Sequence, residues 1–158
     1  MNQLDMFSED GVVWSVWVDG AARGNPGPAG AGVFIQKNNE SVLTCGFYLG
    51  EKTNNQAEYY ALLLGCFFLE SRIGPQDILH IYSDSQLLTR QLTGVYAIKN
   101  VFLKDLAQCV RSFLRSRVYA IYHVVRSKNT IADSLANQGI DKKIPVPVDF
   151  KKFCERYR

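Results

Sequence analysis

The first third of the chain consists of short apolar runs separated by polar turns. A largely apolar run covers residues 12–19, and two more cover residues 33–36 and 42–49. Apolar runs of this length, bounded by turn residues, predict strands. Residues 21–32 are rich in glycine and proline and predict a long turn, and residues 37–40 predict a second turn. The pattern therefore predicts an antiparallel meander of three strands.

From Asn55 onward the apolar residues recur every three or four positions, which predicts a helix that ends before Gly74-Pro75. Either Thr53 or Asn54 can cap its start. The remaining pattern predicts, in order, a strand over 78–82, a helix over 85–92, a helix over 101–115, a strand over 118–125, a helix over 131–138, an extended segment over 144–148 and a short terminal helix.

This order of elements predicts an α/β fold. A long helix between two strands favours a parallel crossover, so we expect a mixed five-stranded sheet, three antiparallel strands plus two parallel, flanked by helices. In such sheets ligands bind at the carboxyl ends of parallel strands. A length of 158 residues suggests a single main domain. We place it at residues 11–141, between a flexible N-terminal segment, 1–10, and a C-terminal extension, 142–158.

Composition narrows the class of protein. Hydrophobic residues make up 47% of the chain, enough for an ordinary core, and the sequence contains neither a membrane-length apolar run nor a secretory signal. Its four cysteines lack metal-ligand spacing, which favours reduced thiols. We therefore expect a cytoplasmic protein without membrane contact, with a monomer as the default state.

The net charge of +3 is too small to indicate nucleic-acid binding by itself. Its distribution is uneven, because six basic residues but only Asp105 fall between positions 90 and 117. For Arg111, Arg115 and Arg117, a solvated helix face is the favoured interpretation.

Four acidic residues carry the candidate chemistry. Asp19 ends the first strand, Glu58 lies one turn into the first helix, Asp84 follows the strand over 78–82, and Asp133 lies near the start of the helix over 131–138. Carboxylates at strand ends and in first helical turns point out of the core. Four of them converge only if cations offset their repulsion. A pair of hard divalent metals, which prefer oxygen ligands, is the natural candidate.

Four segments in this order resemble the type 1 ribonuclease H family: Asp19–Pro28, Thr53–Glu58, Ser83–Gln86 and Asn129–Asn137. One such motif alone is weak, whereas four in the same order are specific, and the resemblance covers roughly residues 12–140. It implies a ribonuclease H-like fold, with residues 11–141 as the catalytic domain. It also implies an endoribonuclease that hydrolyses the RNA strand of RNA–DNA hybrids and leaves 5′-phosphate and 3′-hydroxyl ends.

The resemblance assigns Asp19, Glu58, Asp84 and Asp133 as catalytic ligands of two Mg²⁺ ions, with Mn²⁺ able to replace them. Asp19 would bridge the two ions, and Asp133 would hold the ion that activates water. Glu58 and Asp84 would hold the ion that faces the leaving oxygen, with Glu58 also sensing the ribose 2′-hydroxyl. Taken singly, each acid is equally consistent with a helix cap or a surface charge.

The same resemblance implies two sets of substrate contacts. Amide side chains suit base edges and 2′-hydroxyls, and the residues implied to contact the RNA strand are Asn25, Asn54 and Gln86. A DNA phosphate would be gripped by Thr53 and Asn100, with Asn55 beside it and Lys99 adding charge. Helix capping is an alternative role for Asn54 and Asn55, and both roles are compatible.

Two departures from the family pattern matter. The segment 125–129 is short and lacks the histidine that many members carry before the last aspartate, and Arg126 is a candidate electrostatic substitute. The segment 92–100 is too short for the basic helix that some members insert there. Both features are typical of a short-loop branch. The missing basic helix predicts hybrid binding that is weaker and more sensitive to salt.

A separate motif lies at the N-terminus. Residues 3–7 resemble the peptide by which bacterial replication and repair proteins dock on the sliding clamp, with Gln3 fixing register and Leu4, Met6 and Phe7 entering an apolar groove. Short motifs also match by chance, and the alternative is a leader whose apolar residues cover the sheet.

Two other functions stay open at this point. One is a nuclease of the same fold that acts on double-stranded RNA or on DNA, because a fold does not determine its substrate. The other is a non-catalytic module that binds hybrids. The Thr53-Asn54-Asn55 and Asn100 signature favours hybrid cleavage over the first, and the presence of all four carboxylates favours it over the second.

Overall fold

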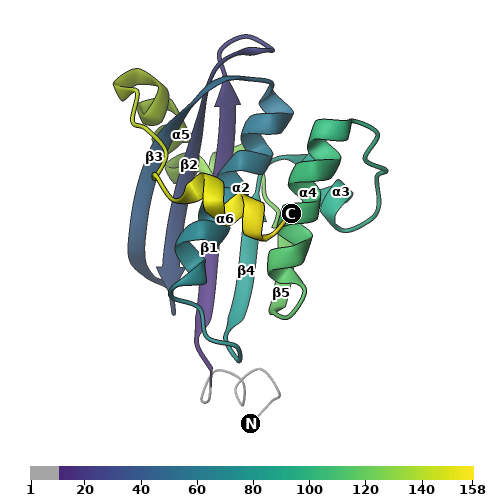
Figure 1. Cartoon of the computed structure of the whole chain (residues 1–158). Coiled ribbons are helices and arrows are strands. Elements are labelled where there is room, and N and C mark those ends of the chain that lie inside the picture. Colours follow the sequence, from purple (N-terminus) through teal and green to yellow (C-terminus); the bar gives the residue numbers. More distant parts are fainter. Residues whose placement is uncertain (1–10) are drawn as a thin grey trace.

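A mixed five-stranded sheet forms the centre of the protein (Figure 1). The computed structural model describes residues 11–158, so the expected clamp-docking residues Gln3, Leu4, Met6 and Phe7 lie outside the described residues. The elements are β1 (Val13–Ala22), β2 (Gly27–Lys37), β3 (Glu40–Lys52), α2 (Asn54–Glu70), β4 (Ile78–Ser83), α3 (Gln86–Leu92), α4 (Val101–Leu114), β5 (Val118–His123), a 3₁₀ turn η1 (Arg126–Lys128), α5 (Thr130–Lys142) and α6 (Phe150–Arg156).

The strand order is β3-β2-β1-β4-β5, with three antiparallel strands followed by two parallel ones. β1 pairs antiparallel with β2 and parallel with β4, and Val18 lies opposite Ser83 in the parallel pair. β4 pairs parallel with β5. The carboxyl ends of β1 and β4 therefore meet at one edge of the sheet. The predicted fold class is confirmed.

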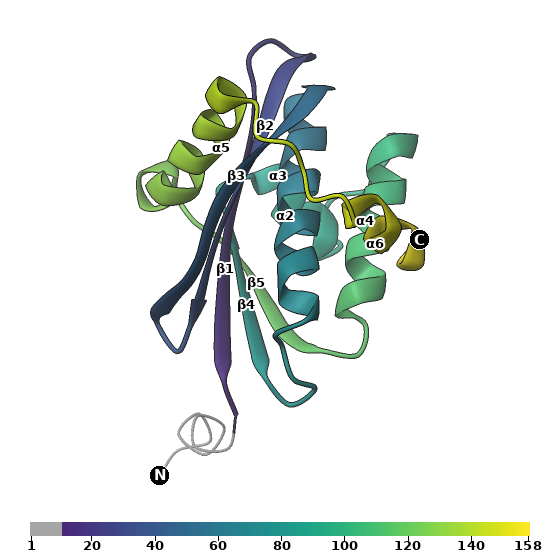
Figure 2. The ribbon, with the colours of Figure 1, turned by 60° about the vertical axis from the view of Figure 1, so that its left-hand side comes forward.

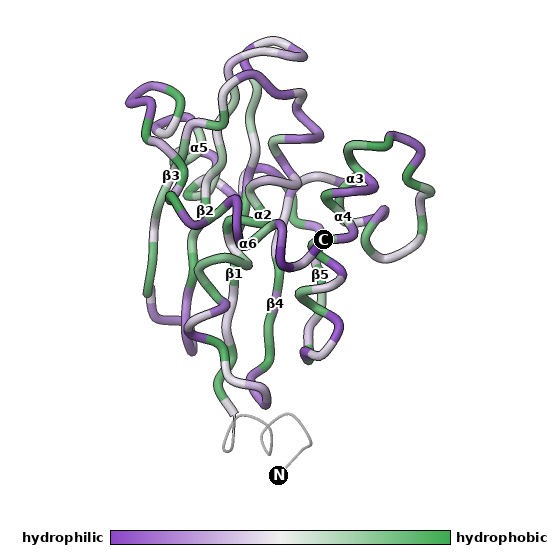
Figure 3. Tube along the Cα trace, viewed as in Figure 1, coloured by the Kyte–Doolittle hydropathy of each residue, from purple (hydrophilic) through white to green (hydrophobic). Residues whose placement is uncertain are grey.

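The molecule has three layers (Figure 2). α5 packs on one face of the sheet, over β1, β2 and β3, whereas α2, α4 and α6 lie on the other. The core fills the space between the sheet and α2, where Val16, Val18, Val33 and Leu64 are fully buried. Figure 3 shows hydrophobic stretches along strand β4, next to the central strand β1. No helix in the described part of the chain is long and apolar enough to cross a membrane.

The long turn expected over residues 21–32 is wrong. β1 continues to Ala22 and β2 begins at Gly27, so the turn is confined to residues 23–26. Gly30 and Gly32 are strand residues: a Cβ at these positions would lie 2.2 Å from the carbonyl oxygen of Ala136 and 2.0 Å from that of Ala132. Glycine thus allows the backbone of α5 to approach β2 closely. At these two positions glycine serves the packing of helix on sheet rather than a turn.

α5 is also longer than the predicted range of 131–138. α5 continues through Gly139 to Lys142. A Cβ on Gly139 would lie 2.5 Å from the backbone nitrogen of Phe47, so this glycine also serves the contact between helix and sheet. The helix ends where Lys143 adopts a left-handed conformation with φ of 49°. The last strand, by contrast, stops at His123 rather than at residue 125.

The C-terminal extension is packed against the main domain. α6 places Phe150 and Phe153 in the core, and the ring of Phe153 contacts those of Phe67 and Phe113. The hydroxyl of Tyr157 donates a hydrogen bond of 2.6 Å to Glu70 at the end of α2. Residues beyond α5 therefore help to cover α2 and α4, on the face of the sheet away from α5.

Candidate active site

An open groove lies at the sheet edge where β1 and β4 end. Polar side chains dominate its lining, which consists of Asp19, Gly20, Ala21, Ala22, Arg23, Asn54, Asn55, Glu58, Asp84, Ser85, Arg126, Asp133 and Asn137. Strand β1, helices α2 and α5 and the segments that follow β4 and β5 all contribute to it.

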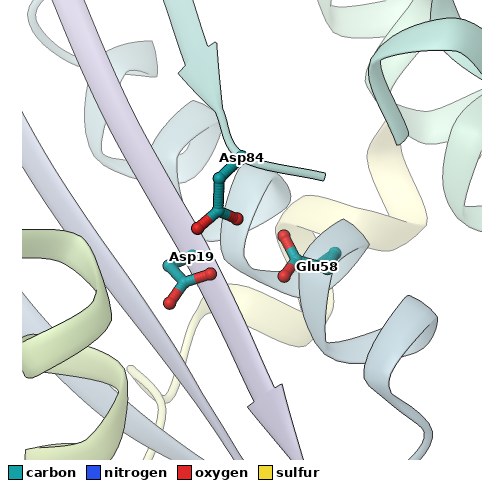
Figure 4. Close-up of side chains that lie close together, drawn as sticks. All are labelled: Asp19, Glu58 and Asp84. Atoms are coloured by element: carbon teal, nitrogen blue, oxygen red, sulfur yellow. The ribbon is translucent and has the colours of Figure 1, made fainter. Parts of the chain in front are cut away.

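Three carboxylates converge in this groove (Figure 4). Asp19 extends from β1, Asp84 follows β4, and Glu58 points toward them from α2. One oxygen atom of each lies within 4.8 Å of the others. Asp19 is 2% exposed and Glu58 9%, and the side chain of Asp84 is 8% exposed. Such buried like charges are tolerated only as protonated acids or as ligands of a cation.

Gly20 brings α2 to the end of β1. A Cβ at this position would lie 2.2 Å from the carbonyl carbon of Ala57 and 2.3 Å from the backbone nitrogen of Glu58. Only a residue without a side chain allows the two backbones to approach so closely. The Asp19-Gly20 pair therefore provides both one carboxylate and the space that admits the second.

Protonation in the cluster is strongly perturbed. Burial raises the pKa of Asp19 far above its ordinary value, and the negative charges of Glu58 and Asp84 raise it further. Burial and the charge of Asp84 likewise raise the pKa of Glu58. Oxygen Oε2 of Glu58 and oxygen Oδ2 of Asp84 are buried without a hydrogen-bond partner. These donor oxygens fit a hard divalent cation, which would satisfy them and offset the repulsion.

Asp133 lines the same groove from the first turn of α5, outside the cluster of three. Its charge contributes to the raised pKa of Asp19. Arg126 provides only weak compensation, because its Nε atom lies 3.9 Å from Oδ2 of Asp84 and its side chain is 84% exposed. The structure thus brings all four predicted carboxylates to one groove and three of them into contact range of one ion.

Asn54 and Asn25 join the turn after β1 to the start of α2. The backbone nitrogen of Ala22 donates to Oδ1 of Asn54 at 3.0 Å, and the backbone nitrogen of Asn54 donates to Oδ1 of Asn25 at 3.1 Å. Thr53 caps α2 in a reciprocal capping box with Gln56. These residues therefore have structural roles, while Asn54 and the exposed Asn55 also line the groove.

The other predicted substrate contacts lie outside the groove lining. Gln86 is exposed at the start of α3, and Lys99 is exposed in the segment before α4. Asn100 caps α4, because its Oδ1 accepts a hydrogen bond of 3.1 Å from the backbone nitrogen of Leu103. Residues 93–100 connect α3 to α4 without forming a helix.

Three polar residues that sequence reasoning did not assign to the site emerge from the structure. Arg23 and Asn137 line the groove, and Asn129 is 2% exposed at the start of α5. The Nδ2 atom of Asn129 donates a hydrogen bond of 2.9 Å to the carbonyl oxygen of Val18, the residue before Asp19. Asn129 and Asn137 flank Asp133 within the same motif, which is the one signal that points to them.

Replacing Asn129 with alanine should destabilise the protein. The change leaves the buried carbonyl of Val18 without its donor, so we expect a loss of about 1–3 kcal/mol in the free energy of unfolding. Urea denaturation monitored by circular dichroism measures the loss. Thr130→Ala changes an exposed neighbour and should leave the midpoint nearly unchanged. Equal midpoints for wild type and Asn129→Ala would contradict this role.

Stability of the metal-free protein should depend on pH through Asp19. Its pKa is raised on folding, so its contribution is fully present below its ordinary pKa of 3.8 and is lost as pH rises toward the raised value. The thermal midpoint in EDTA should therefore fall between about pH 5 and 9, and Mg²⁺ should offset the fall. Asp19→Asn should flatten the profile. An unchanged slope in this variant would show that other groups dominate.

Comparison with known proteins agrees with this geometry. A family model described as reverse transcriptase-like matches residues 17–139. Ribonuclease HI of Halobacterium salinarum is 39% identical over 127 residues, which cover 79% of this chain and 63% of that protein. Ribonuclease H of Coxiella burnetii is 33% identical over 154 residues, with 85% of this chain and 93% of that protein covered.

Solved structures of proteins named RNase H1 are also similar to this chain. The crystal structure of RNase H1 from Halobacterium salinarum superposes with a TM-score of 0.78 at 34% identity, covering 82% of this chain and 98% of that one. The structure of LC11-RNase H1 in complex with an RNA/DNA hybrid superposes with a TM-score of 0.75 at 36% identity, covering 83% of this chain and 97% of that one.

The fold and the carboxylate groove define a protein of the ribonuclease H-like class. Within that class, the chain belongs to the type 1 ribonuclease H family, as the identity and coverage of these relatives show. The resemblance found in the sequence is thereby confirmed. The chain spans 63% of the length of the Halobacterium relative and 34% of the length of the mycobacterial relatives that it also matches.

Proposed function

We propose that this protein is an endoribonuclease that hydrolyses the RNA strand of RNA–DNA hybrids and leaves 5′-phosphate and 3′-hydroxyl ends. The observation that carries this proposal is the convergence of Asp19, Glu58 and Asp84 within 4.8 Å in an open polar groove. A similar protein has been solved with an RNA/DNA hybrid, and its likeness to this chain supports the choice of substrate.

Asp19, Glu58, Asp84 and Asp133 are the residues that would hold two Mg²⁺ ions, with Mn²⁺ able to replace them. When bound, a pair of such ions activates water and neutralises the developing charge on the leaving oxygen. The carboxylates supply hard oxygen ligands at a sheet edge open to a long substrate. Asp19 belongs to the cluster of three and also senses the charge of Asp133, which suits a ligand shared between two positions.

The other three carboxylates would act on opposite sides of Asp19. Asp133 would serve the side on which water attacks, and Glu58 and Asp84 the side of the leaving 3′ oxygen. Glu58 is held at the end of β1 by the close approach at Gly20, so its carboxylate would be fixed beside the ribose 2′-hydroxyl. Arg126 would add positive charge near Asp84, in place of a loop histidine.

Substrate recognition would use the amides around the groove. Asn25, Asn54 and Gln86 would contact the RNA strand, since an amide both donates and accepts hydrogen bonds. Thr53, Asn55 and Asn100 would hold a DNA phosphate, with Lys99 contributing charge. Support is strongest for Asn54 and Asn55, which line the groove next to the carboxylates.

Outside the catalytic domain, we propose that a monomeric, cytoplasmic protein docks on the replication sliding clamp through Gln3, Leu4, Met6 and Phe7. Surface plasmon resonance with immobilised clamp tests the docking motif. Deletion of residues 1–8 should abolish the signal and leave nuclease activity intact, whereas equal binding by both forms would refute the motif.

Cleavage of four labelled substrates tests the proposed function: an RNA–DNA hybrid, double-stranded RNA, double-stranded DNA and single strands. We expect Mg²⁺-dependent cleavage of the hybrid alone, with 5′-phosphate products. Cleavage of double-stranded RNA or DNA in preference to the hybrid would favour another nuclease of the same fold. Binding of the hybrid without cleavage, in either Mg²⁺ or Mn²⁺, would favour a binding module.

A further inference from the structure

Arg23 occupies a fixed position at the edge of the groove. It begins the turn 23–26 and is held from the opposite side by α5. Its Nη1 atom lies 2.7 Å from Oδ1 of Asp141, and its Nη2 atom donates to Oδ1 of Asn137 at 3.2 Å. The side chain of Arg23 is nevertheless 47% exposed. An exposed guanidinium with two partners on one helix has a defined direction and retains free N–H donors.

A nucleic-acid strand is polyanionic, so its binding in the groove requires cationic side chains beside the acidic ones. Among the described residues that line it, the acids are Asp19, Glu58, Asp84 and Asp133, and the cations are Arg23 and Arg126. Arg126 lies on the Asp84 side, after β5, whereas Arg23 lies on the side of α5. A polyanionic strand in this groove therefore meets a guanidinium of Arg23 beside the turn that also carries Asn25.

We propose that Arg23 is a further substrate-binding residue, which binds a non-scissile phosphate of the nucleic-acid strand that lies in the groove and is oriented for this contact by Asn137 and Asp141. The inference rests on the proposed function. Arginine suits the task because its planar donors match the oxygens of a phosphate.

The helix that orients Arg23 also carries a catalytic carboxylate. Asp133, Asn137 and Asp141 are spaced four residues apart and lie along one face of α5. Asn137 connects the two functions directly, because its Nδ2 atom donates a hydrogen bond of 3.1 Å to the backbone oxygen of Asp133 while its Oδ1 atom accepts from Arg23. A phosphate held by Arg23 would thus be placed at a fixed distance along the strand from Asp133.

Asp141 orients Arg23 without removing its charge from the groove. The side chain of Asp141 is 60% exposed, and water screens an ion pair of this kind. Hydrogen bonding to Arg23 lowers the pKa of Asp141, so both partners are charged at neutral pH. Asp141 and Asn137 together occupy two of the five N–H donors of Arg23, and the others are available to a phosphate.

The dependence of hybrid binding on salt tests the proposal. Binding of a fluorescent RNA–DNA hybrid is measured by anisotropy between 50 and 200 mM KCl, in Mg²⁺ and in an Asp84→Asn background that prevents cleavage. We expect Arg23→Ala to weaken binding about tenfold at the lowest salt. It should also reduce the slope of log Kd against log salt by about one, the value for one lost phosphate contact. In the cleaving protein, KM should rise while kcat stays nearly constant.

Two further variants separate binding from folding and from net charge. Arg115→Ala removes an exposed surface charge at the end of α4, outside the groove lining, and should leave the slope unchanged. Arg23→Lys keeps the charge and loses the planar fork, so it should restore the slope and only part of the affinity. Circular dichroism melting of each variant checks that the fold is retained.

The outcomes distinguish this inference from the function on which it rests. Equal slope and equal affinity for Arg23→Ala and its parent would overturn the role of Arg23 while leaving hybrid cleavage intact. A drop in kcat at constant KM would likewise overturn it in favour of a purely structural effect on Asp133. Failure of the wild-type protein to bind or cleave the hybrid would instead overturn the proposed function.

Discussion

Replacing Asp84 with asparagine should reduce hybrid cleavage by at least about 100-fold, because even the loss of an outer-shell partner of a metal ligand costs 10- to 100-fold. Asparagine keeps the shape of the side chain and removes the charge. The Oδ2 atom of Asp84, like Oε2 of Glu58, is buried without a hydrogen-bond partner, so a bound cation would satisfy it. Initial rates in saturating Mg²⁺ measure the loss, and isothermal titration calorimetry measures the accompanying loss of Mg²⁺ binding.

The fold should survive this change, since it removes one of three mutually repelling carboxylates. The thermal midpoint of Asp84→Asn in EDTA should equal or exceed that of the wild type. Asp105→Asn is the matched control, because Asp105 is an exposed aspartate on α4 paired with Arg158. It should cleave at the wild-type rate. Retention of full activity and Mg²⁺ affinity by Asp84→Asn would contradict the assigned site.

Adding one methyl group in Gly32→Ala should strongly destabilise the protein. The new Cβ would lie 2.0 Å from the carbonyl oxygen of Ala132 and 2.7 Å from the backbone nitrogen of Ala136, so α5 must move away from β2. Overpacking of this kind costs about 1–3 kcal/mol and occasionally more. Because Asp133 follows Ala132, its carboxylate would move as well. Urea denaturation and cleavage rates measured on the folded fraction test both effects.

Gly65→Ala is the matched control for this prediction. A Cβ there would lie 2.9 Å from Cγ2 of Val16, a side-chain rather than a backbone atom, and alanine favours the helix by about 1 kcal/mol. The free energy of unfolding should therefore change much less than for Gly32→Ala. Similar losses for both variants would show that general crowding, rather than the backbone of α5, sets the cost.

The sequence predicted the order and type of the elements, because apolar periodicity records which side of each strand or helix is buried. It misplaced the boundaries around Gly27, Gly30, Gly32 and Gly139. From the local pattern alone, glycine predicts turns and helix ends. At the last three positions its role is set by a segment far away in the sequence, so local pattern reasoning had no access to it.

The candidate site likewise contains residues that the sequence predicts and residues that only the structure identifies. The four carboxylates are recognisable because the chemistry requires particular residue types after particular elements. Arg23 and Asn129 act through partners more than 100 residues away, Asn137 with Asp141 for one and Val18 for the other. Their partners become visible only when the sheet and α5 are assembled. Asn100 is the opposite case. The resemblance predicts a phosphate contact for it, whereas its contact in the structure is the cap of α4.

The hydrogen bonds between the turn 23–26 and the start of α2 also bear on the thermodynamics of binding. Ala22, Asn25 and Asn54 are joined by backbone-to-amide contacts that exist before any ligand arrives. The conformational entropy of this wall of the groove is therefore lost during folding rather than on association. A strand that enters the groove meets a preorganised surface, and the unfavourable entropy of complex formation should come mainly from the nucleic acid.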